Sequence, residues 1–241
     1  MGRHGTIANR KASQDAKRAA MFTKYVRAII VAAKAGGNPE YNASLRVAIE
    51  KAKAISLPND KIERAIKKGT GELEGESYTE QTFEGYGPGG VAIIVDTLSD
   101  NSNRVTASVR SAFAKNGGNL GTNGCVTYMF QRKGVLLIEK TDEVDEDTLM
   151  EAALEAGAED FKVEEDCFEV YTDPADYNDV FTALQEAGYE FVESDVEYVP
   201  SMEATPDEFD LPKLRKLIDA LEENDDVQKV SHNCAVDLYE D

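Results

Sequence analysis

The sequence of 241 residues has no tryptophan, two histidines and three cysteines, and these shortages restrict its chemistry. With only His4 and His232 available, we expect neither a catalytic triad nor a transition-metal site. Cys125, Cys167 and Cys234 are odd in number and far apart in the sequence, so no disulfide framework or zinc motif is indicated. We interpret them as small core residues of a protein in a reducing, cytoplasmic compartment.

Long apolar runs and several catalytic motifs are also missing. No stretch approaches the roughly 18 apolar residues of a membrane helix, and the N-terminal residues contain no apolar signal region, so we expect neither a membrane location nor secretion. The motifs G-x-x-x-x-G-K-[ST], H-E-x-x-H and G-x-S-x-G do not occur. Nucleotide hydrolysis, zinc proteolysis and serine hydrolase chemistry therefore have no support, and we predict a protein that is not an enzyme and needs no cofactor or metal.

Charge is abundant but very unevenly distributed. The chain has 26 basic and 46 acidic residues, a formal net charge of -20. Residues 1–70 hold 15 of the basic and 5 of the acidic residues, a net charge of +10. The remaining 11 basic and 41 acidic residues give residues 71–241 a net charge of -30. Such asymmetry is typical of a basic arm that binds nucleic acid, carried by an acidic body.

The basic arm, residues 1–76, is predicted to be a three-helix domain. Apolar residues at helical spacing indicate a first helix over residues 9–35. A second helix is expected to start at Pro39 with Asn38 as its cap, and a third to start at Pro58 and to end at Gly69.

The basic faces of these helices favour binding to phosphates of a nucleic acid. They carry few Asn or Gln side chains, so nothing marks one helix as a reader of base edges. The alternatives are a merely soluble exterior, or docking against the acidic part of the chain. The candidate phosphate contacts are Arg3, Arg10, Lys11, Lys17, Arg18, Lys24, Arg27, Lys51, Lys53, Lys67 and Lys68.

The remainder is predicted to form two ferredoxin-like α/β domains, one inserted into the other, so that the whole chain is a multidomain α+β protein. Residues 135–200 have the complete order β-α-β-β-α-β. Residues 77–134 supply an edge strand at 81–84, a strand at 91–98, a helix opening at 100–103 and a strand at 125–130. A helix at 206–223 and a strand at 227–238 complete this split domain, which comprises residues 77–134 and 201–241.

The segment GYGPGG is the point at which composition and structural period change. It spells G-x-G-x-x-G but precedes a strand, whereas a dinucleotide loop would follow a strand and open a helix. We interpret it as an interdomain junction between the basic arm and the first long strand, with the tyrosine packed between the two. Its residues are Gly85, Tyr86, Gly87, Pro88, Gly89 and Gly90.

Two further stretches allow alternative interpretations. The polar, glycine-rich loop 116–124 is either a contact loop or a long turn. Residues 136–241 contain 34 acidic and 6 basic residues. This acidic surface is a docking face for a basic partner protein, a clamp that keeps nucleic acid on the arm, or a solvated exterior. A second hypothesis is therefore a protein-interaction module in which the arm is structural.

The runs RKASQDAKR, FTKYVRAIIVAAKAGGNPEYNASLRVAIEKAKAISLPNDKIERAIKKGTGE and EGYGPGGVAIIVDTLSDNSNRVTASVRSAFAKNGGNLGTNGCVTYMFQRKG resemble the YebC/PmpR family. The resemblance implies a helical domain, two α/β domains and a nucleic-acid-binding regulator of gene expression. In that family some members regulate transcription on DNA, while others are translation factors on ribosomal RNA, including mitochondrial translational activators. Many members carry a Trp near the start, where this chain has Gly5–Asn9, so a stacking role for that Trp has no counterpart here.

Overall fold

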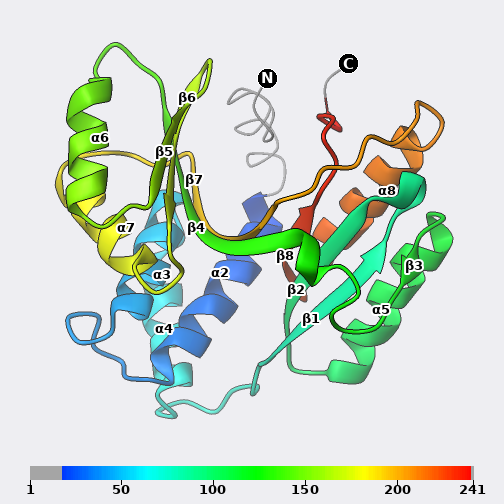
Figure 1. Cartoon of the computed structure of the whole chain (residues 1–241). Coiled ribbons are helices and arrows are strands. Elements are labelled where there is room, and N and C mark those ends of the chain that lie inside the picture. Colours follow the sequence, from blue (N-terminus) through cyan, green and yellow to red (C-terminus); the bar gives the residue numbers. More distant parts are fainter. Residues whose placement is uncertain (1–17, 240–241) are drawn as a thin grey trace. The chain divides into compact units, whose positions relative to one another are not determined.

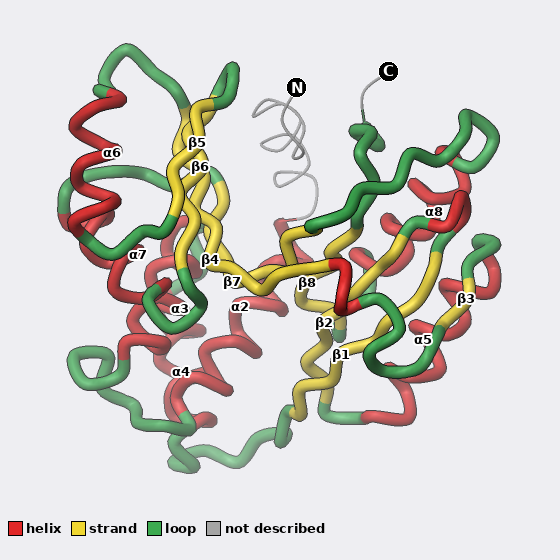
Figure 2. The backbone as a smooth tube through the Cα atoms, in the orientation of Figure 1, coloured by secondary structure: helices red, strands yellow, loops and turns green. Residues whose placement is uncertain are grey.

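The computed structural model describes residues 18–239 (Figure 1). They divide into two compact units, one of residues 18–131 with 200–238 and one of residues 132–199 with residue 239. The first unit contains a helical bundle and a four-stranded sheet, and the second contains another four-stranded sheet (Figure 2). The α+β class predicted from the sequence is confirmed. Within the described part of the chain, no helix combines the length and apolar character needed to cross a membrane.

The helical bundle consists of α2 (Arg18–Ala33), α3 (Ala43–Ala54) and α4 (Asn59–Gly69). Their apolar stripes meet in one core, because residues three and four positions apart share a helix face. The core residues include Ile29, Ala33, Leu45, Ala52, Ile62 and Ala65. The predicted start of the first helix at residue 9 lies outside the described residues.

The second helix of the bundle starts later than predicted. Asn42, not Asn38, is the cap of α3, and its Oδ1 accepts a hydrogen bond from the Leu45 amide at 3.0 Å. The Asn42 amide nitrogen also donates to the carbonyl oxygens of Ala32 and Gly36, both at 2.8 Å. The Asn42 side chain thus forms hydrogen bonds with backbone groups at the end of α2 and at the start of α3. It therefore determines where α3 begins.

The sheet of the first unit has the order β3-β1-β2-β8, with all described pairings antiparallel. Its strands are β1 (Thr79–Tyr86), β2 (Ala92–Ser99), β3 (Asn119–Leu120) and β8 (Val227–His232). Two helices, α5 (Ser102–Lys115) and α8 (Leu211–Glu222), pack on the same sheet face, which Val91, Ile93 and Val95 supply. Elements that precede and elements that follow the second unit in the sequence thus share one core.

One strand prediction for this sheet is confirmed and one is wrong. The expected strand at 81–84 lies within β1, which is longer than predicted and whose described pairing with β3 involves only Gly85 and Tyr86. The expected strand at 125–130 is instead a loop and a short 3-10 turn over Thr127–Met129, visible as the short red segment before β4 in Figure 2. The amides of Val126 and Thr127 donate to the Glu84 carboxylate and so cannot join a strand ladder.

The second unit has the sheet order β5-β6-β4-β7. Its elements are β4 (Phe130–Glu139), α6 (Glu146–Glu155), β5 (Asp160–Val163), β6 (Cys167–Thr172), α7 (Tyr177–Glu186) and β7 (Glu193–Pro200). The order β-α-β-β-α-β with the first and third strands adjacent at the centre is the ferredoxin-like arrangement. Val135, Leu137, Cys167 and Tyr171 form a buried cluster on this sheet.

The segment 85–90 is not an interdomain junction. Gly85 and Tyr86 end β1, and Pro88–Gly90 form the turn of the β1–β2 hairpin, in which the Gly87 amide donates to the Val91 carbonyl at 2.8 Å. Gly89 has a φ of 69°, and a Cβ there would lie 2.4 Å from that of Pro206. The turn therefore packs on the chain that leads into α8, and residues 70–78 make the connection from the helices to the sheet.

Candidate nucleic-acid interface

The third helix of the bundle, α4, presents the most open group of cations. Lys61, Arg64 and Lys67 are exposed, and Lys68 is half-buried with an ion pair to Glu76 at 3.4 Å. Spacings of three and four residues place Lys61, Arg64 and Lys68 along one face of the helix. Lys67 and Lys68 also lie in the last turn, where the helix dipole favours positive charge.

The predicted phosphate contacts on α3 are less accessible than the cations of α4. Lys53 is exposed and forms an ion pair with Glu50 at 2.8 Å, three residues earlier on the same helix. Such exposed pairs contribute little to stability and open easily, so Lys53 can still reach a phosphate. Lys51 is half-buried on the same helix.

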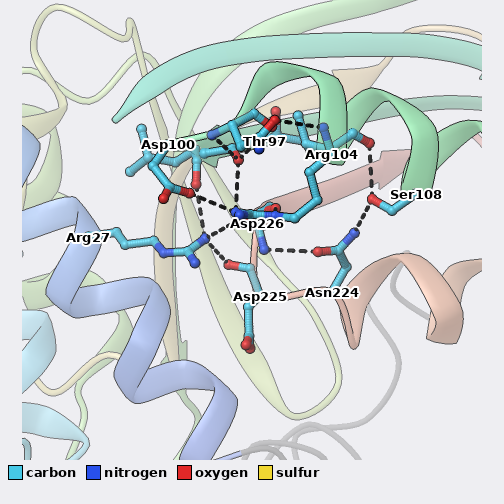
Figure 3. A network of polar contacts seen from close by, with 12 residues as sticks. Arg27, Thr97, Asp100, Arg104, Ser108, Asn224, Asp225 and Asp226 are labelled. Atoms are coloured by element: carbon cyan, nitrogen blue, oxygen red, sulfur yellow. Dashed lines mark hydrogen bonds and ion pairs between the residues drawn. The ribbon is translucent and has the colours of Figure 1, made fainter. Parts of the chain in front are cut away.

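Two of the predicted contacts, Lys24 and Arg27, form hydrogen bonds within the protein. Figure 3 shows the surroundings of Arg27. The Arg27 guanidinium donates from Nη1 to Asp226 Oδ1 at 2.7 Å and to the carbonyl oxygens of Leu98 at 3.0 Å and Asp225 at 2.6 Å. Only 12% of the Arg27 side chain is exposed. In this structure the guanidinium joins α2 to the end of β2 and to the loop before β8, which argues against Arg27 as a phosphate contact.

Lys24, one helical turn before Arg27, binds the same region. Its ammonium group donates to the Glu222 carbonyl at 3.0 Å, at the last residue of α8. A cation at this position satisfies a carbonyl that has no partner within the helix and interacts favourably with the dipole. The same argument applies to Lys24 as a phosphate contact.

The acceptor at the centre of this network is Asp226, whose side chain is 5% exposed. Its second partner is Arg104 of α5, which donates from Nε to Oδ2 at 3.0 Å and from Nη2 to Oδ1 at 2.9 Å. Burial raises the pKa of Asp226, but the hydrogen bonds and charges of Arg104 and Arg27 outweigh it and hold the pKa below its usual value. Arg104 also donates to Asp100 at 2.7 Å and lowers the pKa of that carboxyl.

A surface pocket of about 460 Å³ lies beside this network. Its walls include the two arginines, Tyr78 and Asn224, together with five carboxylates: Glu76, Asp100, Glu223, Asp225 and Asp226. The Tyr78 ring lies with its centroid 5.3 Å from the Arg27 guanidinium carbon. Because carboxylates outnumber guanidinium groups and both arginines are paired, the pocket repels a phosphate.

Four of the predicted phosphate contacts lie outside the described residues: Arg3, Arg10, Lys11 and Lys17. Arg18 begins α2, but its side chain is not among those described. The structure adds Lys61 and Arg64 to the set, and their spacing along the third helix was the signal available in the sequence. In the described part of the chain, no group of three or more His, Cys, Asp or Glu residues is arranged to hold a metal ion.

Comparison with known proteins gives a consistent result over nearly the whole chain. The family model described as the TACO1/YebC protein N-terminal domain matches residues 3–72, and the one described as the TACO1/YebC second and third domain matches residues 78–234. A probable transcriptional regulatory protein of Clostridioides difficile is 55% identical over 239 residues, 98% of this chain and 100% of that protein.

Two further proteins are similar over comparable lengths. A probable transcriptional regulatory protein of Clostridium novyi is 58% identical over 228 residues, which cover 94% of this chain and 93% of the relative. The crystal structure of a conserved hypothetical protein from Aquifex aeolicus matches with a TM-score of 0.83 at 45% identity, covering 96% of this chain and 93% of that one.

Proposed function

Because this chain belongs to the TACO1/YebC family, we propose that it is a non-enzymatic, nucleic-acid-binding regulator of transcription that holds DNA on its N-terminal helical domain. Relatives that are more than half identical to it are named probable transcriptional regulatory proteins. The proposed ligand is a nucleic acid, and we propose DNA in particular.

The observation that carries the proposal is the separation of charge. The first 70 residues have a net charge of +10 within a chain of -20, and α4 displays Lys61, Arg64 and Lys67 to solvent. A polyanion is attracted to this domain and repelled by the acidic remainder. The acidic surface would therefore restrict where the nucleic acid lies, in addition to keeping the protein soluble.

The proposed phosphate contacts lie on the basic faces of the bundle. On its described part they are Lys51, Lys53, Lys61, Arg64, Lys67 and Lys68, joined by the predicted contacts before residue 19. Lys24 and Arg27 are excluded because their charged groups bind Glu222, Leu98, Asp225 and Asp226. Each phosphate contact releases counterions, so affinity should fall steeply as salt is added.

Charge reversal on α4 tests the proposal. We expect the triple variant Lys61→Glu, Arg64→Glu, Lys67→Glu to bind a labelled DNA duplex at least tenfold more weakly and with a shallower salt dependence than the native chain. A matched control is the triple variant Lys213→Glu, Arg215→Glu, Lys216→Glu on α8, which changes the net charge equally at three exposed positions. Equal affinity losses in both variants would contradict a specific role for the bundle.

The nucleic acid bound in cells decides between DNA and RNA. Protein crosslinked in cells and recovered under denaturing conditions should carry DNA fragments enriched in promoter regions. Recovery of ribosomal RNA in their place would contradict the transcriptional proposal and would favour a role in translation. Recovery of neither would contradict nucleic-acid binding itself.

A further inference from the structure

The loop between α5 and β4 differs in character from the rest of the molecule. This loop, residues 116–129 with the short strand β3, and the first two residues of β4 contain no Asp, Glu, Lys or Arg, although such residues make up 30% of the chain. The loop is nonetheless at the surface, where Asn119, Asn123 and Tyr128 are exposed. Its exposed hydrogen-bonding side chains are therefore amides and hydroxyls, which can both donate to and accept from the edges of nucleobases.

A buried carboxylate holds this loop in place. Glu84 of β1 is 6% exposed, and it accepts hydrogen bonds from the amides of Gly124 at 2.7 Å, Val126 at 3.0 Å and Thr127 at 3.0 Å. Gly124 has a φ of 86°, a conformation that glycine adopts without strain. Burying a carboxylate is costly unless it is well bonded, so this arrangement stabilises one loop conformation at the expense of others.

Tyr128 is the exposed tyrosine of the loop, and Tyr86 of β1 lies close to it. The Tyr86 hydroxyl donates to the Cys125 carbonyl at 3.1 Å. A side-chain hydrogen bond with Tyr128 is the main reason why the pKa of Tyr86 is raised. Tyr128 is 67% exposed even though a large ring would be more stable if it were buried. An exposed aromatic ring offers a free face on which a nucleobase can stack.

We propose that this loop binds unpaired nucleobases, with Tyr128 stacking on a base and Asn123 hydrogen-bonding to a base edge. This inference rests on the proposed function and adds the class of ligand to it. Phosphate contacts position a nucleic acid, whereas base contacts discriminate among sequences. The cations of the bundle supply the first kind of contact, and the uncharged loop supplies the second.

Unpaired bases are favoured over duplex because of the shape of the contact. An exposed ring can stack only on a base whose face is free, as in single strands, bulges and loops. Glu84 is a positioning residue in this proposal: it does not touch the ligand but holds the backbone that carries Asn123 and Tyr128.

Single-stranded oligonucleotides of mixed sequence, as DNA and as RNA, and the matching DNA duplex provide the test, with the full-length protein. Tyr128→Ala should weaken binding to the single strands about tenfold, without changing the salt dependence, and should change duplex binding less than twofold. Tyr128→Phe, which keeps the ring, should bind nearly as well as the native chain. The matched control is Tyr41→Ala, since Tyr41 is 88% exposed on a different loop.

The outcomes separate this inference from the proposed function. Unchanged single-strand binding by Tyr128→Ala, while charge reversal on α4 weakens binding, would overturn the inference alone. If charge reversal on α4 has no effect, or the native chain binds no nucleic acid, both are overturned. An equal loss of single-strand affinity in Tyr41→Ala would also overturn the inference about the loop, because the effect would then not be specific to Tyr128. A preference for the RNA or the DNA strand would identify which source of unpaired bases the loop recognises.

Discussion

At the scale of single residues, Glu84 is the side chain whose role depends most on its protonation. Burial raises the pKa of Glu84, but hydrogen bonds from the backbone amides of the loop and from the Thr127 side chain lower it by more than burial raises it. The pKa of Glu84 therefore lies below the usual 4.5. A carboxyl with a lowered pKa in the folded state adds stability above its unfolded pKa and loses that stability as pH falls through the folded value. Burial and the charge of Glu84 raise the pKa of Cys125, so this thiol does not titrate in the acidic range.

We therefore expect Glu84→Gln to reduce the free energy of unfolding by about 2 kcal/mol at pH 7, because an amide accepts weaker hydrogen bonds and brings its own N–H donors against those of the loop. The difference between the native chain and the variant should shrink as pH falls below 4.5. Urea denaturation at neutral and acidic pH measures both quantities. A difference that stays constant with pH would show that the charge of Glu84 is not what holds the loop.

At the scale of secondary-structure elements, Asn42 joins the end of α2 to the start of α3. We expect Asn42→Ala to destabilise the helical bundle by about 2 kcal/mol, since it removes a helix cap and two hydrogen bonds from a side chain that is only 9% exposed. Thermal unfolding measures the loss. Asn38→Ala is the control, because Asn38 is exposed and its side chain bonds only to the Glu40 amide among the contacts that the structure describes. Equal losses in the two variants would contradict the capping role.

The spacing of apolar residues in the sequence correctly predicted those helices whose bounds depend on local residues alone. The spacing of Ile62 and Ala65 and the terminal Gly69 are local signals, and α4 lies where they indicate. The start of α3 was missed because two asparagines, Asn38 and Asn42, are both suitable caps, and only the contacts of Asn42 with the end of α2 decide between them.

The missed strand at 125–130 has a similar cause. Its β-branched and aromatic residues resemble a strand, but Glu84, about 40 residues earlier, takes the amides that a strand would need. Single-sequence patterns do not contain that pairing. The same limitation explains the G-x-G-x-x-G segment: its glycines indicated a turn correctly, while its position within the β1–β2 hairpin depends on the partner of β1.

At the scale of the whole molecule, the charge separation could be predicted completely from the sequence, but the use of each cation could not. Arg27 has the same sequence character as the exposed lysines, yet its partner Asp226 lies 199 residues away along the chain. Sequence spacing on α2 gives no sign of that pair. The sequence therefore predicted the three helices of the bundle in outline. The role of the bundle as a nucleic-acid interface and its phosphate contacts stay predictions.

A comparison of Arg27→Met with Lys67→Met tests this division between structural and ligand-binding cations. Arg27→Met leaves the buried Asp226 with one guanidinium partner fewer, so we expect a loss of about 3 kcal/mol in stability. Its slope of log affinity against log salt should equal that of the native chain. Lys67→Met, at an exposed position, should change stability by less than about 0.5 kcal/mol and reduce the slope by about 0.9. If both variants reduce the slope equally, Arg27 contacts phosphate in the complex, and the contacts with Asp226 must open when nucleic acid binds.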